Sequence, residues 1–536
     1  MAPPTRRLGA VAQHLGPRTS SAAALQSESQ PAPSRHPGPK LFDDAAMMDF
    51  VREGFVMFHL DDLPSSYHAR ICEQMEAVIE KSGNPGNNML PMVPDLMTML
   101  KHPLVDGALQ SILGTDYYVH LHRHVHNLLA TNVDEGEPGA VKRLHKDSMG
   151  NSRFAVDAKR RQHRTRMCML MYFPQDTPIE LGPTAVMPRA QYLLHQPEPG
   201  EDTVPYEPDK RAIHCAGPAG TVAIVHYDML HTSTNKIMAQ PRHMIKFLFS
   251  RMTEPDSGPT WDSDGAAWEG SDNLQEPIWR AQWDWHCGRP DKPSCEAATS
   301  DVAALSTELH SECEMDAVRA AYALGVGGGG PDSVDALVTT LCDIDDSAPL
   351  PENQPDQIRQ NYYQSDPVCQ AGYGLVEMGA AAVPALQAAA GSSTPLIRSR
   401  AIDVLGDMGP QATASMPQLL AALEDPHDDP RRRAAEALGT VGCGAPNQAE
   451  LCVTLAKLMS DDSQQVRRNA AYSLARLGPA MAGSGADESA VVEALSAGLV
   501  DEYQYVRGFS ALALQRVGTP AAMGAVLSHL QVMRFD

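Results

Sequence analysis

Basic residues, paired cysteines and long apolar runs are all scarce in this sequence. Its 43 Lys and Arg face 66 Asp and Glu, and the net charge of -23 would repel phosphate backbones, which argues against nucleic acid as a partner. No apolar run reaches the roughly 18 residues of a membrane-spanning helix. The 10 cysteines include no Cys-x-x-Cys pair, which favours a reduced intracellular protein over a disulfide-stapled or zinc-ribbon one. We therefore expect a soluble protein, most simply a cytoplasmic one.

Residues 1–40 lack acidic groups almost entirely, since Glu28 is their single acid. Their richness in Pro, Ser and Ala predicts a disordered leader. Arg-rich, Ser-rich and acid-poor segments are also typical of organelle transit peptides, so a mitochondrion or plastid is the alternative to the cytoplasm. Pro3, Pro4 and Pro17 interrupt the amphipathic helix that such a signal would need.

The spacing of apolar residues changes along the chain, whose length of 536 residues predicts two or three domains. Between Leu41 and Gly114 apolar residues recur every three or four positions, which predicts helices. From Tyr117 onward, short apolar runs such as "RMCMLMYF", "GTVAIVHYD" and "RHMIKFLFS" are separated by turn residues. Antiparallel strands in this arrangement are typical of a double-stranded β-helix, or jelly roll. All 5 tryptophans follow, and "EPIWRAQWDW" predicts a helix that packs its indoles against a neighbouring domain.

From about residue 301 the sequence repeats itself. Segments such as "RAAYALG" at Arg319, "RAIDVLGDMG" at Arg400 and "RAAEALGTVG" at Arg433 share a small residue, a helical face and a closing glycine. A second apolar helix completes each unit, and paired helices at this period predict an all-α solenoid. The units resemble HEAT repeats. We accordingly expect a multidomain chain with a leader (1–40), a jelly-roll domain with N-terminal helices (41–290), a linker (291–310) and a HEAT-like domain (311–536).

One of the four His-x-Asp pairs in the chain has the neighbours that a metal site needs. Alternate residues of a strand share a face, so His145 and Asp147 would project together. His231, at the end of a later strand, supplies the third ligand of a two-His, one-carboxylate iron site. Arg242, at the head of the next strand, can hold a dicarboxylate with its planar guanidinium. The other three pairs do not have this combination of a later His and Arg on strands: His59/Asp61, His226/Asp228 and His427/Asp429.

Residues 42 to about 290 resemble the phytanoyl-CoA dioxygenase family of Fe(II)/2-oxoglutarate oxygenases. "FVREGFVMFHLDDL" resembles the opening helix and strand of that family, and "LHKD" its metal motif. "PQDTPIELGPTAVMPRAQY" resembles the segment after the motif, and "GTVAIVHYDMLHTSTN" with "PRHMIKF" the distal His and the co-substrate Arg. The resemblance implies Fe(II), 2-oxoglutarate and O2, with metal ligands and co-substrate contacts as follows: His145, Asp147 and His231 for iron, and Arg242, Ser233 and Asn127 for 2-oxoglutarate.

Two details of the resemblance bear on the reaction and the substrate. Asp147 is retained where halogenases of this family carry a small residue, which implies hydroxylation or a related oxidation. "MPRAQY" departs from the Pro-Gly-Ser-His that the family often has, so the turn at Arg189 and Ala190 leaves substrate selection open. Because the family oxidises acyl thioesters, amino acids and natural products on one scaffold, the expected substrate is only a small organic or acyl compound.

Two polar segments have more than one interpretation. His120, His122, His124 and His126 share one strand face, which is either a second metal site or, more simply, a polar pocket or solvent-facing surface. "AKRRQHRTR", residues 158–166, either binds an anionic group such as the phosphates of a CoA thioester or, more simply, forms a solvated loop.

Two functional hypotheses follow. The first is a non-haem Fe(II)/2-oxoglutarate-dependent dioxygenase whose HEAT-like repeats bind a protein partner, self-associate or pack on the oxygenase domain itself. The second is a HEAT-repeat scaffold with an oxygenase fold that does not turn over. The complete ligand set and Arg242 favour the first. Iron held by the repeats, as in HEAT-like deoxyhypusine hydroxylases, is excluded because the sequence contains no His-Glu dipeptide.

Overall fold

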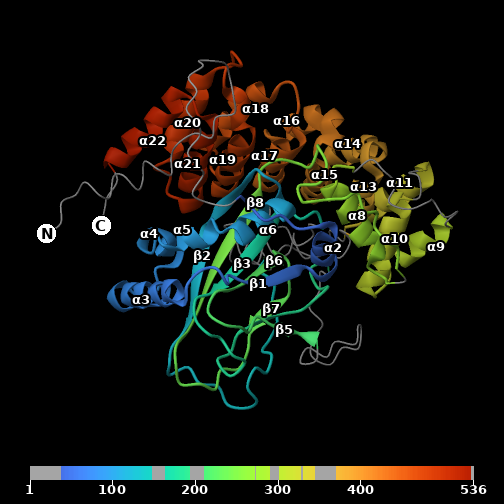
Figure 1. Cartoon of the computed structure of the whole chain (residues 1–536). Helices are drawn as coiled ribbons and strands as arrows, with labels where there is room; N and C mark the ends of the chain where they lie inside the picture. The colour runs from blue at the N-terminus through green and yellow to red at the C-terminus, as the bar shows by residue number, and fades with distance from the viewer. Residues whose placement is uncertain are drawn as a thin grey trace, which may run out of the picture. The chain divides into compact units, whose positions relative to one another are not determined.

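The computed structural model describes residues 38–147, 163–192, 211–271, 273–289, 301–326, 330–344 and 370–532 (Figure 1). Most of the predicted leader and the first half of the predicted linker lie outside these residues. The chain divides into two compact units, one of residues 39–445 and one whose described part consists of Gly38 and residues 446–532. Among the described helices, none is both long and apolar enough to cross a membrane.

Two antiparallel sheets form the predicted jelly roll (Figure 1). The larger has the strand order β1-β6-β3-β8-β2 and the smaller β5-β4-β7. The apolar runs of the sequence supply the central strands of the larger sheet. The strands are β1 (Phe55–His59), β2 (Tyr117–Leu128), β3 (Met167–Phe173), β4 (Thr184–Val186), β5 (Ile213–His214), β6 (Thr221–His226), β7 (His231–Ser233) and β8 (Arg242–Arg251).

The two faces of the larger sheet have different neighbours. Leu170, Ile245 and Phe247 belong to the core that the sheet shares with the helices of its outer face. Alternate residues, such as Met169 and Met244, belong to a separate inner cluster between the two sheets. The outer helices, which include the predicted tryptophan helix α8, are α2 (Asp44–Glu53), α3 (Ser65–Ser82), α4 (Met89–Met92), α5 (Leu96–Leu100), α6 (Pro103–Leu113) and α8 (Glu276–His286).

Asp44 joins the first turn of α2 to the tryptophan segment. Its Oδ1 accepts a hydrogen bond of 2.6 Å from Nε1 of Trp261, and its Oδ2 accepts from the backbone N–H groups of Asp264 at 3.0 Å and Ala266 at 3.1 Å. Burial by itself would raise the pKa of Asp44, but these hydrogen bonds, led by that of Trp261, lower the pKa to about 2. The carboxylate therefore stabilises the fold in its ionised form.

We expect Asp44→Asn to lower stability by about 2 kcal/mol at neutral pH. A pKa lower in the folded than in the unfolded state gives stabilisation that is complete above about pH 4 and is lost as the pH falls towards 2. The difference in melting temperature between wild type and variant should therefore shrink between pH 5 and pH 3. A difference that stays constant over this range would show that the charge of Asp44 contributes nothing.

The predicted paired helices of the repeats are present in both units. In the 39–445 unit they follow the short helix α9 (Val302–Glu308) and comprise α10 (Glu314–Val326), α11 (Pro331–Cys342), α13 (Gln370–Met378), α14 (Val383–Ala390), α15 (Pro395–Met408), α16 (Met416–Ala422) and α17 (Asp428–Val441). The second unit comprises α18 (Gln448–Lys457), α19 (Gln464–Leu477), α20 (Glu488–Gly498), α21 (Gln504–Val517) and α22 (Pro520–Val532). This pattern confirms the HEAT-like architecture that the sequence predicts.

The first repeats pack directly on the core of the jelly-roll domain. Met315, Val318 and Tyr322 of α10 belong to the same buried apolar cluster as Trp279 and Trp283 of α8. For these repeats, the structure therefore shows the alternative in which the solenoid packs on its own jelly-roll domain. The predicted boundaries at residues 290 and 311 remain predictions.

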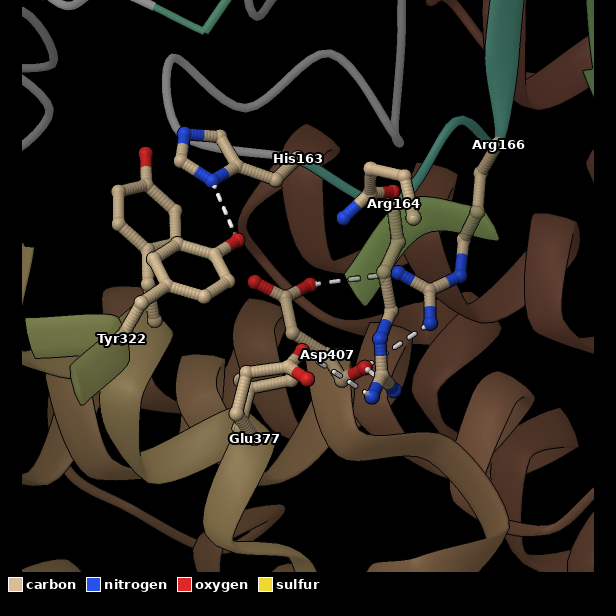
Figure 2. Close-up of a pocket in the computed structure, with 9 residues that line it drawn as sticks. His163, Arg164, Arg166, Tyr322, Glu377 and Asp407 are labelled. Atoms are coloured by element: carbon tan, nitrogen blue, oxygen red, sulfur yellow. Dashed lines mark hydrogen bonds and ion pairs between the residues drawn. The ribbon is translucent and has the colours of Figure 1, made fainter. Parts of the chain in front are cut away.

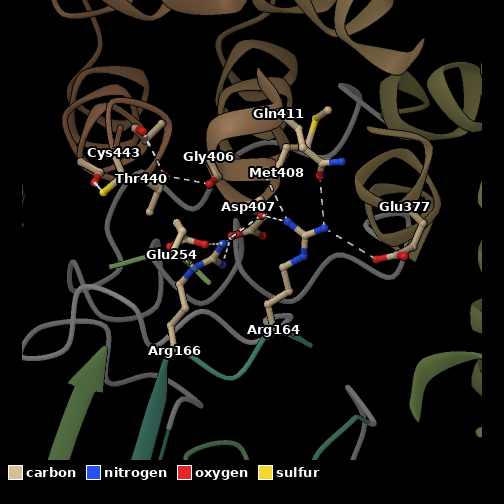
Figure 3. A network of polar contacts seen from close by, with 12 residues as sticks. Arg164, Arg166, Glu254, Glu377, Gly406, Asp407, Met408, Gln411, Thr440 and Cys443 are labelled. Carbon is tan, nitrogen blue, oxygen red and sulfur yellow. Dashed lines mark hydrogen bonds and ion pairs between the residues drawn. The ribbon is translucent and has the colours of Figure 1, made fainter. Parts of the chain in front are cut away.

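A buried ion-pair network strengthens this contact (Figure 3). Arg166, which immediately precedes β3, donates from Nε and Nη2 to the two carboxylate oxygens of Glu254 at 2.9 Å each. It also donates to the backbone carbonyl of Asp407 in α15 at 3.0 Å. Arg164 donates to the same carbonyl at 2.8 Å and lies 3.9 Å from the carboxylate of Glu377 in α13. The two arginines thus connect the sheet to two repeats.

His163 fills the adjoining space (Figure 2). Its ring stacks on Tyr373 with centroids 3.6 Å apart, and its Nδ1 lies 2.7 Å from the hydroxyl of Tyr322. The remaining cavity, lined also by Arg164 and Glu377, measures about 20 Å³, which is room for a water molecule and not for a cofactor. Neither interpretation of the basic segment 158–166 therefore holds for residues 163–166, because they are buried against the repeats; residues 158–162 lie outside the described residues.

Candidate metal centre

The two histidines predicted as ligands meet at the smaller sheet. His145 pairs with His231, the first residue of β7, in an isolated antiparallel bridge. Each donates its backbone N–H to the carbonyl oxygen of the other at 3.0 Å. Directly paired residues of antiparallel strands project to the same side. The two imidazole rings accordingly lie together, with 4.5 Å between their centroids.

Asp147 completes the cluster. Its Oδ1 lies 3.8 Å from Nε2 of His145 and 3.8 Å from Nε2 of His231. One donor atom from each residue lies within 4.8 Å of the others, which is an arrangement that one metal ion could draw together. The side chain of His231 is 4% exposed and that of His145 is 53% exposed, so the cluster is open to solvent on the His145 side.

Burial, charge and hydrogen bonding favour the protonation states in which these side chains can bind a metal. Burial lowers the pKa of His231 to about 4, although the charge of Asp147 opposes the shift. The neutral ring can donate from Nδ1 to the Met229 carbonyl at 3.0 Å, which leaves a lone pair on Nε2. Burial would raise the pKa of Asp147, but Lys246 and then His231 hold it below its ordinary value. Neutral imidazoles and a carboxylate are what a divalent metal requires.

Arg242 begins β8 and is 2% exposed. Its Nη1 lies 3.5 Å from the His126 carbonyl, at the limit of a hydrogen bond, and its Nε has no partner within the described part of the chain. No carboxylate among the described residues pairs with it, and burial lowers its pKa to about 10. A buried guanidinium that no described carboxylate neutralises is suited to bind an anionic ligand.

The other two predicted co-substrate contacts lie on different faces. Ser233, two positions after His231 in β7, shares the face of that histidine. Asn127 pairs across the sheet with His243, whose ring contacts Glu76 of the outer helix α3 at 3.0 Å. Directly paired residues share a face, so Asn127 lies on the outer face, opposite to Arg242. The structure therefore brings Ser233 towards the cluster and does not bring Asn127 there.

Lys246 lies within the segment "PRHMIKF" but is not among the predicted ligands or co-substrate contacts, and it contacts the cluster directly. Its Nζ lies 2.6 Å from Oδ2 of Asp147. A signal for it exists in the sequence, since residues 242, 244 and 246 of one strand share a face and "MIKFLF" is otherwise apolar.

The predicted histidine comb also lies near this lysine. His124 is paired across the sheet with Lys246, and the rings of His124 and His126 are 4.8 Å apart. Burial, followed by the charge of Lys246, lowers the pKa of His122 to about 4. Within the described residues, the only group of three potential ligands is the His145 cluster, so the comb lines a polar face there and forms no second such group.

The other His-x-Asp pairs have local roles. Nδ1 of His59 lies 2.6 Å from Asp61, although His59 ends strand β1 and does not lie in a helix as expected. Nδ1 of His226 accepts from the backbone of Asp228 at 3.1 Å. In the third pair Asp429 makes ion pairs with nearby arginines of α17.

The departure at "MPRAQY" has a structural explanation. Arg189 has a φ of 65°, and no other non-glycine residue in the described segments has a positive φ. This is a conformation that glycine adopts without steric cost. The side chain of Arg189 lies 2.6 Å from the carboxylate of Glu53 in α2 and 5.6 Å from the ring centroid of Trp279 in α8. The turn thus keeps a glycine-like backbone while its arginine joins two outer helices.

Two protein families match parts of the chain. Residues 74–244 match the phytanoyl-CoA dioxygenase (PhyH) family, and residues 369–439 and 416–484 match HEAT repeats. No curated protein matches the chain. Similar solved structures include the non-heme alpha ketoglutarate dependent carbocyclase SnoK from nogalamycin biosynthesis, with 15% identity over 42% of this chain and 90% of that one and a TM-score of 0.31. Another is EctD from S. alaskensis with 2-oxoglutarate and 5-hydroxyectoine, with 14% identity, 44% and 86% coverage and a TM-score of 0.32.

A jelly roll that gathers two histidines and a carboxylate defines the class of non-haem iron oxygenases. With the family match, the chain carries a phytanoyl-CoA dioxygenase domain, which is an Fe(II)/2-oxoglutarate-dependent dioxygenase, followed by HEAT repeats.

Proposed function

We propose that this enzyme hydroxylates a small organic or acyl substrate, with His145, Asp147 and His231 as iron ligands and Arg242 and Ser233 as 2-oxoglutarate contacts. The observation that carries the proposal is the convergence of three donor atoms within 4.8 Å of one another. Nε2 of His231 has no hydrogen-bond partner among the described residues, which fits a nitrogen that serves a metal. Bound Fe(II) would supply the oxidation chemistry with O2 and 2-oxoglutarate.

The residues of the chain have distinct tasks in this proposal. Asp147 and the histidines hold the metal at the edge of the inner cluster. Arg242 pairs with the distal carboxylate of 2-oxoglutarate, for which its fork is geometrically matched. The apolar inner cluster that includes Met169 and Met244 keeps water from the deeper wall of the site. The scaffold alternative gives no reason for a full ligand set together with a buried arginine that no carboxylate of the described residues pairs with.

Anaerobic addition of Fe(II) and 2-oxoglutarate to the purified protein is expected to produce the visible charge-transfer band of the chelate. Asp147→Ala should abolish this band because it removes the anionic ligand. Asp134→Ala is the matched control, since Asp134 is held by Lys142 at 2.7 Å outside the cluster, and it should leave the band unchanged. A folded wild type without the band would favour the scaffold hypothesis instead.

We further propose that the first repeats support the oxygenase domain, and that any protein partner or second copy binds elsewhere on the repeats. The shared apolar cluster and the Arg164 and Arg166 contacts support this role. An intracellular location, most simply the cytoplasm, is consistent with the thiols, because every cysteine in the described ranges is free, including the buried Cys168 and Cys215.

A further inference from the structure

The two oxygens of Asp147 face different partners. Oδ1 is the atom nearest to both histidines, at 3.8 Å from each Nε2. Oδ2 instead accepts from Nζ of Lys246 at 2.6 Å, the length of a strong charge-assisted hydrogen bond. The carboxylate is therefore divided between a side that meets the histidines and a side that meets an ammonium group.

Packing alone does not explain a lysine at this position. Lys246 is 5% exposed, and its neighbours on the same strand face, Met244 and Leu248, belong to the apolar inner cluster. A buried ammonium group costs several kcal/mol unless it is paired. Among the described carboxylates, Asp147 is the one that lies within ion-pair distance of it. Asp147 therefore supplies the negative charge that this buried ammonium group needs.

Lys246 does not occupy the position that a metal ion would take between the three ligands. A group that took the place of the metal would contact the histidine nitrogens as well as the carboxylate. Within the described contacts, Lys246 makes no hydrogen bond to His145 or His231 and approaches the carboxylate from the other oxygen. Lys246 therefore contacts the oxygen of Asp147 that is not the one nearest to the histidines, and it is not itself one of the ligands.

We propose that Lys246 is a positioning residue that holds Oδ2 of Asp147 and so limits this carboxylate to one metal bond, through Oδ1. A two-His, one-carboxylate site must keep coordination positions open for its co-substrates. A carboxylate bound through both oxygens would occupy one of them. The inference rests on the proposed function and adds the group that keeps the aspartate monodentate.

The test compares Lys246→Met, which keeps an unbranched side chain without the charge, with Lys246→Arg, which keeps a cationic donor. Lys142→Met is the matched control, because Lys142 makes an ion pair of 2.7 Å with Asp134 outside the cluster. Two measurements are made anaerobically on the full chain. The first is a titration with Co(II) without 2-oxoglutarate, which gives the metal affinity and a visible spectrum whose intensity depends on coordination number. The second is the affinity of the Fe(II)-loaded protein for 2-oxoglutarate.

We expect Lys246→Met to weaken the Co(II) visible bands, as a rise in coordination number does, and to weaken 2-oxoglutarate binding about tenfold. Lys246→Arg should restore most of both signals, and Lys142→Met should match wild type. Lys246→Gln, which can still donate to Oδ2, replaces the methionine variant if that variant does not fold, and is expected to fall between wild type and Lys246→Met in both measurements.

Three results would overturn the proposal. Unchanged Co(II) spectra and 2-oxoglutarate affinity in Lys246→Met would show that Lys246 does not position the ligand. Tighter metal binding with unchanged 2-oxoglutarate affinity would show that the lysine merely competes with the metal. A wild type that forms no Fe(II)/2-oxoglutarate chelate would refute the proposed function, and the role of Lys246 with it. A normal wild-type band with unaffected variants refutes the role of Lys246 alone.

Discussion

Replacing Arg166 by methionine is expected to lower the free energy of unfolding of the 39–445 unit by about 3–5 kcal/mol. The side chain of Arg166 is fully buried, and its removal leaves Glu254, which is 7% exposed, without its bidentate partner. The variant also loses the hydrogen bond to the Asp407 carbonyl, and with it a link between β3 and α15. Chemical denaturation followed by tryptophan fluorescence measures the change, because Trp285 lies 5.4 Å from the Arg166 guanidinium.

The surface pair of Arg70 and Asp95 provides the control for Arg166. Its N···O distance of 3.0 Å resembles that of the buried pair, but its side chains are 50% and 41% exposed. Arg70→Met should therefore cost no more than about 1 kcal/mol. The double variant Arg166→Met with Glu254→Leu should recover part of the loss, since the buried carboxylate that lost its bidentate partner is removed as well. Equal losses from Arg166→Met and Arg70→Met would contradict a special role for the buried network.

Strand periodicity predicted the site only in part. A strand would give His145 and Asp147, two residues apart, a common orientation, but in the structure only His145 forms a β-bridge and Asp147 lies in a turn. The meeting of His145 with His231 was predicted from the need for a third metal ligand and from the family resemblance, because no local pattern places one beside the other. The same periodicity could have excluded Asn127, whose odd position in β2 alternates with the inward-facing His124 and His126.

What could not be predicted depends on contacts between segments far apart in the sequence. Lys246 of β8 meets Asp147 only because the fold brings β8 to the segment that follows the isolated bridge between His145 and His231. The basic segment ending at Arg166 has the composition of a solvated loop, and composition does not reveal that Glu254 and the carbonyl of Asp407 will surround its last arginine. Burial of a charge is decided by partners, and partners are set by the tertiary fold.

Arg242→Met is expected to have the opposite thermodynamic signature from Arg166→Met. Both arginines are almost fully buried, but no described carboxylate pairs with Arg242, and burial lowers its pKa to about 10. Removing an unpaired buried charge relieves a desolvation cost, so the melting temperature of the protein without ligand should stay the same or rise. The affinity for 2-oxoglutarate should nevertheless fall about 100-fold, as the loss of a buried ionic contact does. Titration of the Fe(II)/2-oxoglutarate charge-transfer band measures this affinity.

The choice of ligand shows whether Arg242 recognises the distal carboxylate of 2-oxoglutarate. 2-Oxovalerate has the same chelating oxo acid but ends in a methyl group, so wild type should bind it far more weakly than 2-oxoglutarate. Arg242→Met should remove most of this preference, whereas Arg242→Lys, which keeps the charge but not the planar fork, should retain an intermediate preference. If the methionine variant still prefers 2-oxoglutarate as strongly as wild type, another cation binds the carboxylate. Lys246 would then be the first to test, because it shares a face of β8 with Arg242.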